Sequence, residues 1–183
     1  MPIAAEPQTR TLTPETPRAL SGRWLVDPQA SHAGFVARGF AGLVKTQGRF
    51  RCLSGALFVE EAHASGALVI DSSSIDTGNR MRDRHLRSRD FFDVERHPQL
   101  RYEAHSISDR GPGSVRIDGD LIVAETRTRL PLDLTVHSAT DGRVELACHT
   151  EVDRVALGIR GARGMVPRAV DLEVAIALRK AGA

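Results

Sequence analysis

Residues 170–179 read VDLEVAIALR, and they show the clearest pattern in the chain. Apolar residues fill every second position of this stretch: Val170, Leu172, Val174, Ile176 and Leu178. The positions between them hold Asp171, Glu173, Ala175, Ala177 and Arg179. Because successive side chains of a β-strand point to opposite faces of the sheet, this stretch predicts a strand with one apolar face.

The same alternation recurs along most of the chain before residue 170. It is seen in residues 24–26, 31–37, 44–50, 53–59, 67–69, 100–104, 115–123, 130–136 and 144–152. Turn-forming residues separate several of these segments, at Ser65-Gly66, residues 109–113 and Asp141-Gly142. Roughly eight such segments, joined by hairpin turns, predict an antiparallel sheet with a single dry face.

The dry face of this sheet needs a cover, and no long helical pattern is available to supply one. The sheet must therefore close on itself as a barrel or stack as a two-layer sandwich. Aromatic residues make up only 4% of the chain, and many inward positions are small: Ser31, Ala33, Ala37, Thr46, Gly48, Gly55, Ala67, Gly119 and Thr150. We favour an extended eight-stranded antiparallel barrel with an elongated, unfilled apolar lumen. A sandwich that closes over the small residues is the alternative.

One long stretch lacks the alternation: DSSSIDTGNRMRDRHLRSRDFFDVERHP, residues 71–98. It predicts a short helix from about Asn79 to Arg87, with Asp76 or Thr77 as its N-cap. Pro98 stops any helix and returns the chain to a strand. We therefore expect a short helical insertion that covers one end of the barrel lumen.

The apolar residues of this insertion have two possible roles. Met81, Leu86, Phe91 and Phe92 would form the ceiling of a cavity, with His85 and nearby arginines at its mouth, because Met and Phe present large, adaptable apolar surfaces. Alternatively, these residues plug the barrel and the charges only fix a loop.

The insertion holds residue types that occur in catalytic and metal sites, but not at suitable spacings. Asp83, His85 and Ser88 would point in different directions on one short helix, and no G-x-S-x-G elbow is present. The histidines form no H-x-x-x-H pair, and no Gly-rich phosphate loop follows a strand. We expect neither catalysis nor a resident cofactor or metal.

Charge and cysteine content exclude some classes of protein. The net charge is +2, from 25 basic and 23 acidic residues, which is too small for the concentrated basic face of a nucleic-acid-binding protein. The two cysteines, Cys52 and Cys148, both fall in predicted strands. A barrel of this size needs no disulfide, so we expect reduced, packed thiols.

The N-terminal residues 1–21 are rich in Pro, Thr and Glu, and they predict a disordered arm before a single barrel domain, residues 22–183. The arm has neither the basic nor the apolar region of a secretory signal. The chain has no run of about 18 apolar residues, so we expect no integral membrane segment and a cytoplasmic location.

Several motifs resemble the YceI-like family, the lipocalin-like polyisoprenoid-binding proteins. The resemblance lies in residues 74–77 (SIDT), 82–88 (RDRHLRS) and 90–93 (DFFD), followed by His97-Pro98. Weaker similarities extend it over roughly residues 22–180: Trp24-x-Val26-Asp27-Pro28, Gly48-x-Phe50, Gly119-Asp120-Leu121 and Val152-Asp153-Arg154. Two positions depart from the family. Arg38 stands where a His is usual, and Ala124 begins a turn that is usually Gly-Val-Thr-like.

The resemblance implies a barrel that binds, and could transport or store, a long-chain isoprenoid, an isoprenoid quinone or a similar amphiphile. The residues expected to contact this ligand are Phe35, Phe50, Leu57, Val69, Met81, His85, Leu86, Phe91, Phe92, Leu121, Leu134, Val136, Leu146, Cys148, Val174 and Ile176. Exposed strands could also pair two copies into a homodimer. Two alternatives remain: an enzyme acting on such an amphiphile, and a structural or partner-binding barrel with a filled core.

Overall fold

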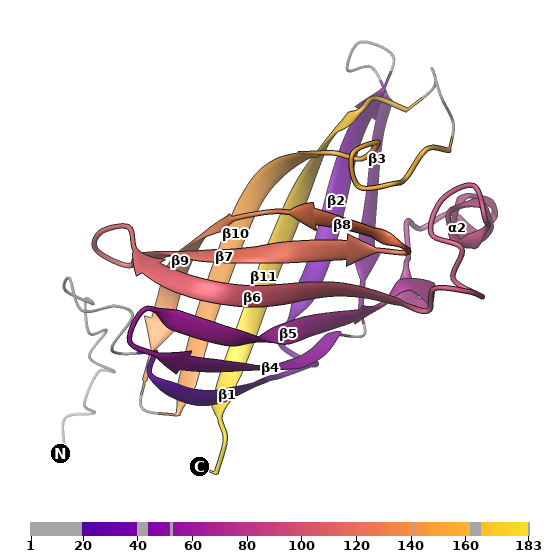
Figure 1. Cartoon of the computed structure of the whole chain (residues 1–183). Helices are drawn as coiled ribbons and strands as arrows, with labels where there is room; N and C mark the ends of the chain where they lie inside the picture. Colours follow the sequence, from indigo (N-terminus) through magenta and orange to yellow (C-terminus); the bar gives the residue numbers. More distant parts are fainter. Residues whose placement is uncertain (1–19, 40–43, 52, 141, 162–165, 183) are drawn as a thin grey trace, which may run out of the picture.

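The computed structural model describes residues 20–39, 44–51, 53–140, 142–161 and 166–182. Strands form most of this part of the chain, and Figure 1 shows them wrapped around one axis. The elements are β1 (Gly22–Val26), β2 (His32–Gly39), β3 (Val44–Phe50), β4 (Leu53–Glu60), β5 (His63–Asp71), η1 (Ser72–Ser74), α2 (Arg80–Arg87), β6 (Gln99–Asp109), β7 (Ser114–Val123), β8 (Thr126–Arg129), β9 (Leu132–Ala139), β10 (Arg143–Asp153) and β11 (Ala169–Lys180).

Eight strands close into a ring of antiparallel pairs. The order around the ring is β1-β4-β5-β6-β7-β9-β10-β11, and β11 returns to β1 through pairs such as Val26 with Leu178. The remaining strands extend this ring: β2 and β3 continue from β11, and β8 pairs with β7. The predicted antiparallel barrel is therefore confirmed, and the sandwich alternative is wrong.

Strand β11 changes its partner along its length, and this shapes the barrel. Its first part pairs with β2, as Leu172 does with Phe35, and its last part pairs with β1. The change occurs at Ala177, whose carbonyl accepts from the Asp27 backbone N–H at 2.8 Å and whose N–H donates to Ser31 Oγ at 3.0 Å. These bonds satisfy the backbone groups that the break between β1 and β2 would leave unpaired.

The insertion between β5 and β6 lies at one end of the barrel, beside β2 and β3 (Figure 1). It contains η1 and then α2, which agrees closely with the predicted helix. Its N-cap is Asn79, whose side-chain oxygen accepts from the N–H groups of Met81 and Arg82. The predicted N-caps, Asp76 and Thr77, lie before the helix.

The end of the barrel away from α2 is filled with side chains. Trp24 is 1% exposed, and its indole N–H donates to the Leu20 carbonyl at 2.7 Å. Leu20 is equally buried, so the packed part of the barrel includes at least two residues before the predicted domain start at Gly22. The rest of the predicted arm, residues 1–19, lies outside the described residues. Cys148 is a buried free thiol, and Cys52 also lies outside the described part of the chain.

Candidate functional site

An apolar cavity of about 330 Å³ lies inside the barrel at the end covered by α2. Its volume is at the lower end of the range for small-molecule sites, about 300 to 1,000 Å³. Nine elements contribute side chains to it, together with the turn after α2, the connection between β8 and β9, and the loop between β10 and β11. The side chains of its wall are overwhelmingly hydrocarbon: Phe35, Ala37, Phe50, Leu68, Ile70, Leu86, Phe91, Phe92, Leu100, Leu121, Val123, Leu130, Leu132, Val152, Leu157, Ile159, Val166, Val170, Leu172 and Val174.

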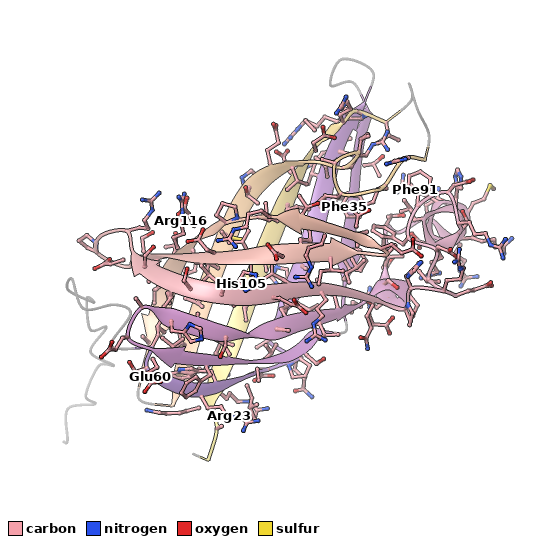
Figure 2. The ribbon with its side chains drawn as sticks, in the orientation of Figure 1. Arg23, Phe35, Glu60, Phe91, His105 and Arg116 are labelled. Atoms are coloured by element: carbon pink, nitrogen blue, oxygen red, sulfur yellow. The ribbon has the colours of Figure 1, made fainter. Side chains whose placement is uncertain are left out.

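Three phenylalanines join the barrel wall to the insertion. The ring of Phe50 on β3 lies 6.5 Å from Phe35 on β2 and 5.6 Å from Phe92, measured between centroids. The second pair meets edge to face, with an interplanar angle of 84°. Such contacts add to the free energy gained from burying the rings themselves. Figure 2 shows Phe35 and Phe91 at the same end of the barrel.

Small residues make the cavity wall in a different way from the one predicted. A Cβ at Gly48 would lie 2.6 Å from the Phe35 ring, and one at Gly119 would lie 2.6 Å from the Tyr102 ring. Aromatic rings therefore occupy the space that these two glycines leave, and the rings themselves line the cavity. Ala37 and Thr46, in contrast, border the cavity directly, as expected.

Two charged residues of the insertion hold α2 in place. Asp83 is buried, and its carboxylate accepts from the backbone N–H and the hydroxyl of Thr77, at 2.9 and 2.5 Å. The guanidinium of Arg87 donates to the carbonyls of Ser73 and Ile75, at 2.8 and 2.6 Å. These bonds tie the helix to the segment that follows β5. Asp83 and Arg87 belong to the motif of residues 82–88, so this motif anchors α2, which covers the cavity as a lid.

His85 and Phe91 stand where the cavity meets solvent. Their rings make an edge-to-face contact, with centroids 5.0 Å apart. The His85 side chain is 57% exposed, and its Nε2 lies 3.6 Å from a carboxylate oxygen of Asp90. Arg82 also borders the cavity, while its guanidinium donates to the hydroxyl and carbonyl of Thr77. The cavity therefore has polar groups at its mouth.

Two polar side chains within the wall are used by the protein itself. The Tyr102 hydroxyl lies 3.0 Å from the Ile117 carbonyl and 2.9 Å from the Leu130 carbonyl, and burial raises the pKa of this phenol well above its usual value. The buried Arg154 guanidinium donates to four carbonyls: those of Ile159, Gly161, Val166 and Pro167. Burial lowers the pKa of Arg154. Arg154 therefore fixes the loop that forms one side of the cavity.

The structure brings about half of the predicted ligand-contacting residues to the cavity. Those that line it are Phe35, Phe50, His85, Leu86, Phe91, Phe92, Leu121 and Val174. Those outside its lining are Leu57, Val69, Met81, Leu134, Val136, Leu146, Cys148 and Ile176. Most of the second group face inward but lie farther from α2, where side chains fill the barrel. Alternation along a strand identifies the inward face, but it carries no information about depth along the barrel axis.

Two positions need a specific correction. Met81, expected in the ceiling, is 80% exposed and lies outside the cavity. Val69 is also outside, because Leu68 and Ile70 are the residues of β5 that face the cavity. Ala64 is also buried and lies an even number of residues from Leu68 and Ile70, so these three residues share the inward face of β5.

The sequence pattern missed many wall residues that the structure adds to the site. Five of them lie on strand faces that the alternation identified as apolar: Leu100, Val123, Leu132, Val152 and Leu172. Their nearness to the insertion was the feature that could have indicated contact with the cavity. Leu157, Ile159 and Val166 come from an irregular loop without any period, so alternation could not identify them. Arg38, where the sequence departs from the family, faces away from this site. Its side chain is 56% exposed and pairs with Asp171 on β11.

Metal-binding clusters and membrane-spanning helices are both absent from the described residues. Within that part of the chain, no three His, Cys, Asp or Glu side chains are grouped so that they could hold a metal ion. Also within it, none of the helices has the length and apolar character needed to cross a membrane.

Comparison with known proteins places this barrel in a family. The family model described as the YceI-like domain matches residues 24–178, which is most of the chain. The chain belongs to the YceI-like family. The resemblance drawn from the insertion motif is therefore confirmed, and the cavity described above is the interior of a YceI-like barrel.

Individual relatives are distant in sequence. A UPF0312 protein of Vibrio parahaemolyticus is 27% identical over 107 residues, which is 56% of this chain and 57% of that protein. The match thus spans only a little over half the length of the relative. BcnA of Burkholderia cenocepacia has a similar fold, with a TM-score of 0.74 at 20% identity, covering 83% of this chain and 98% of BcnA. A polyisoprenoid binding domain from Saccharophagus degradans also has a similar fold, with a TM-score of 0.72 at 16% identity. The match covers 86% of this chain and 98% of that domain's chain.

Proposed function

We propose that this YceI-like barrel binds the apolar chain of an amphiphile, such as an isoprenoid or an isoprenoid quinone, in the cavity beneath α2. The observation that carries the proposal is the cavity itself: about 330 Å³, walled by hydrocarbon side chains. An empty apolar space of this kind loses the van der Waals contacts of its lining, and an apolar guest restores them. The solved polyisoprenoid binding domain of similar fold supports this class of guest.

The proposed guest gains enough free energy from burial alone. Each CH₂ group transferred from water to an apolar environment contributes about 0.8 kcal/mol. About ten buried carbons would therefore contribute on the order of 8 kcal/mol, before the costs of association are subtracted. A longer chain would gain more if the wall can open further, and this favours a long-chain amphiphile over a small polar molecule.

The polar head of the guest would stay at the mouth. His85 and Arg82 border the cavity there, and both can donate hydrogen bonds to a carbonyl, hydroxyl or phosphate oxygen. Deeper in the wall, the polar atoms of Tyr102 and Arg154 are already bonded to backbone carbonyls. The interior therefore suits a chain without polar groups.

We propose binding, with transport or storage of the guest as its use, and we do not propose catalysis. A reaction on the guest would need a proton-transfer group directed at the reacting atoms. His85 lies at the mouth with an exposed side chain, so water competes with the guest for its hydrogen bonds. The polar groups of the wall serve the fold, as described above. The alternative of a filled structural barrel is disfavoured by the cavity.

The test is displacement of an apolar fluorescent probe, 1-anilinonaphthalene-8-sulfonate, from the purified protein. We expect polyprenols and isoprenoid quinones to displace it at micromolar concentration, and short water-soluble analogues of the head groups to leave it bound. The variant Ala37→Phe, which fills the cavity, should bind the probe weakly. Val36→Phe makes a similar change on the same strand, outside the cavity lining, and serves as the control. No displacement by any polyprenol or quinone would refute the proposal.

A further inference from the structure

The outward-facing side of α2 differs from the rest of the barrel surface, and we propose that it docks the protein on the surface of an anionic lipid bilayer. This inference rests on the proposed function, because a carrier of membrane-soluble guests has to collect or deliver them at a membrane. The docking face is defined by Arg80, Met81, Arg84 and Arg89, three exposed arginines and one exposed methionine.

Charge is concentrated on this helix. Residues 80–87 contain four arginines and one acidic residue, Asp83, a net charge of +3, whereas the whole chain carries only +2. Asp83 is buried and bonded to Thr77, so it contributes little to the outer face. Two exposed acids partly offset this charge: Asp90, next to Arg89 in sequence, and Glu95, which lines a surface pocket together with Arg80, Arg84 and Arg89.

The arginines of the docking face are also unpaired. Within the described part of the chain, Arg80, Arg84 and Arg89 make no ion pair or side-chain hydrogen bond. Several arginines on the barrel strands are paired instead: Arg116 pairs with Asp133 at 2.6 Å, and Arg127 pairs with Glu103 at 2.8 Å. Arg23 on β1 and Arg49 on β3 also have no side-chain partner among the described residues, but they stand on separate strands and form no cluster. Unpaired guanidinium groups remain free to bind lipid phosphates, for which their planar donor geometry is well suited.

The position of Met81 favours a bilayer over an acidic protein as the partner. Its side chain is 80% exposed, next to Arg80 in sequence and within the basic helix. A bilayer interface can accommodate both kinds of side chain, because the methionine can enter the acyl boundary while the arginines contact the head groups. The cavity mouth, with His85 and Leu86, belongs to the same helix, so docking would bring the mouth close to the membrane.

The experiment is co-sedimentation of the full chain with vesicles at low salt. One set of vesicles contains phosphatidylcholine alone, and the other contains equal parts of phosphatidylcholine and phosphatidylglycerol. We expect binding only to the anionic vesicles, and its loss at high salt, because salt screens exposed charges. Replacing both arginines in Arg80→Gln/Arg84→Gln should weaken binding roughly 30-fold, since each basic residue near an anionic surface contributes about fivefold. Met81→Gln should give a smaller loss.

The matched control is Arg23→Gln/Lys45→Gln, which removes the same charge from exposed positions outside the insertion, on β1 and β3, that have no side-chain partner among the described residues. It should bind the anionic vesicles like the wild type. Equal loss in both double variants, or absence of binding by the wild type, would overturn the docking inference. Equal binding of the wild type to soluble polyglutamate would overturn it too, in favour of an acidic protein partner. Probe displacement by polyprenols, measured without vesicles, should be unchanged in Arg80→Gln/Arg84→Gln, so failure of docking and failure of guest binding give different results.

Discussion

Ala124 occupies a backbone conformation that suits glycine better. Its φ is +50°, in the left-handed region, in the tight turn between β7 and β8. An L-residue with a Cβ costs about 1–2 kcal/mol there. We therefore expect Ala124→Gly to stabilise the protein by about 0.5–1 kcal/mol, after allowance for the greater freedom of glycine in the unfolded chain. Urea denaturation measures the change, and destabilisation would contradict the geometry of this turn.

Cys148 should make stability depend on pH in the alkaline range. Burial raises the pKa of its thiol from about 9 to about 11. Between these values the unfolded chain loses the thiol proton while the folded chain keeps it, so the free energy of unfolding falls as pH rises. Urea denaturation at pH 8 and pH 10 should show this fall in the wild type. The fall should be smaller in Cys148→Ala, and equal falls in the two proteins would exclude Cys148 as the cause.

At the scale of elements, the buried carboxylate of Asp83 is one of the groups that hold α2 over the cavity. Asp83→Ala removes the acceptor of both Thr77 hydrogen bonds, and hydrogen bonds to charged groups contribute about 1.5–3 kcal/mol each. We expect faster hydrogen exchange of the α2 amides and faster release of the guest, with little change in the strands of the ring. Arg84→Ala, on the same helix but exposed and unpaired, should leave exchange unchanged. Uniformly faster exchange over the whole barrel would show that Asp83 supports the fold rather than the lid.

The elements of this fold were largely predictable from sequence, and the exceptions have physical causes. Strands with polar and apolar residues in strict alternation, such as residues 170–179, were identified with the correct face. The stretch Ala67–Ile70 is apolar at every position, so its inward face could not be distinguished. Met81 looked like a ceiling residue by its chemistry. In the structure α2 is oriented with Asp83 buried and Leu86 against the cavity, and this orientation leaves Met81 exposed.

At the scale of the whole molecule, sequence indicated a barrel with unfilled space but could not locate that space. Alternation identifies inward residues without showing which layer of the barrel they occupy. Trp24 packs with Leu20 at one end, and Arg154 binds the carbonyls of Ile159 and Pro167 at the other, but neither set of contacts is marked by the alternation pattern. Only the three-dimensional arrangement reveals them.

Two alanines on β2 test where the empty space lies. Ala33 and Ala37 are both buried and share the inward face, but Ala37 alone of the pair lines the cavity. Ala37→Phe should therefore leave the free energy of unfolding nearly unchanged, because the ring enters existing space. Ala33→Phe should destabilise the protein by about 1–3 kcal/mol, because it overpacks a filled region. Thermal or urea unfolding distinguishes them, and equal losses would show that the barrel is packed along its whole length.

The most direct test of guest binding is mass spectrometry of the gently purified protein after denaturation, comparing the wild type with Ala37→Phe. We predict that the wild type releases an amphiphile with a long apolar chain, in a constant ratio to protein, and that Ala37→Phe releases far less. Absence of any such molecule from the wild type, or equal amounts from both proteins, would contradict the account of the cavity as a binding site.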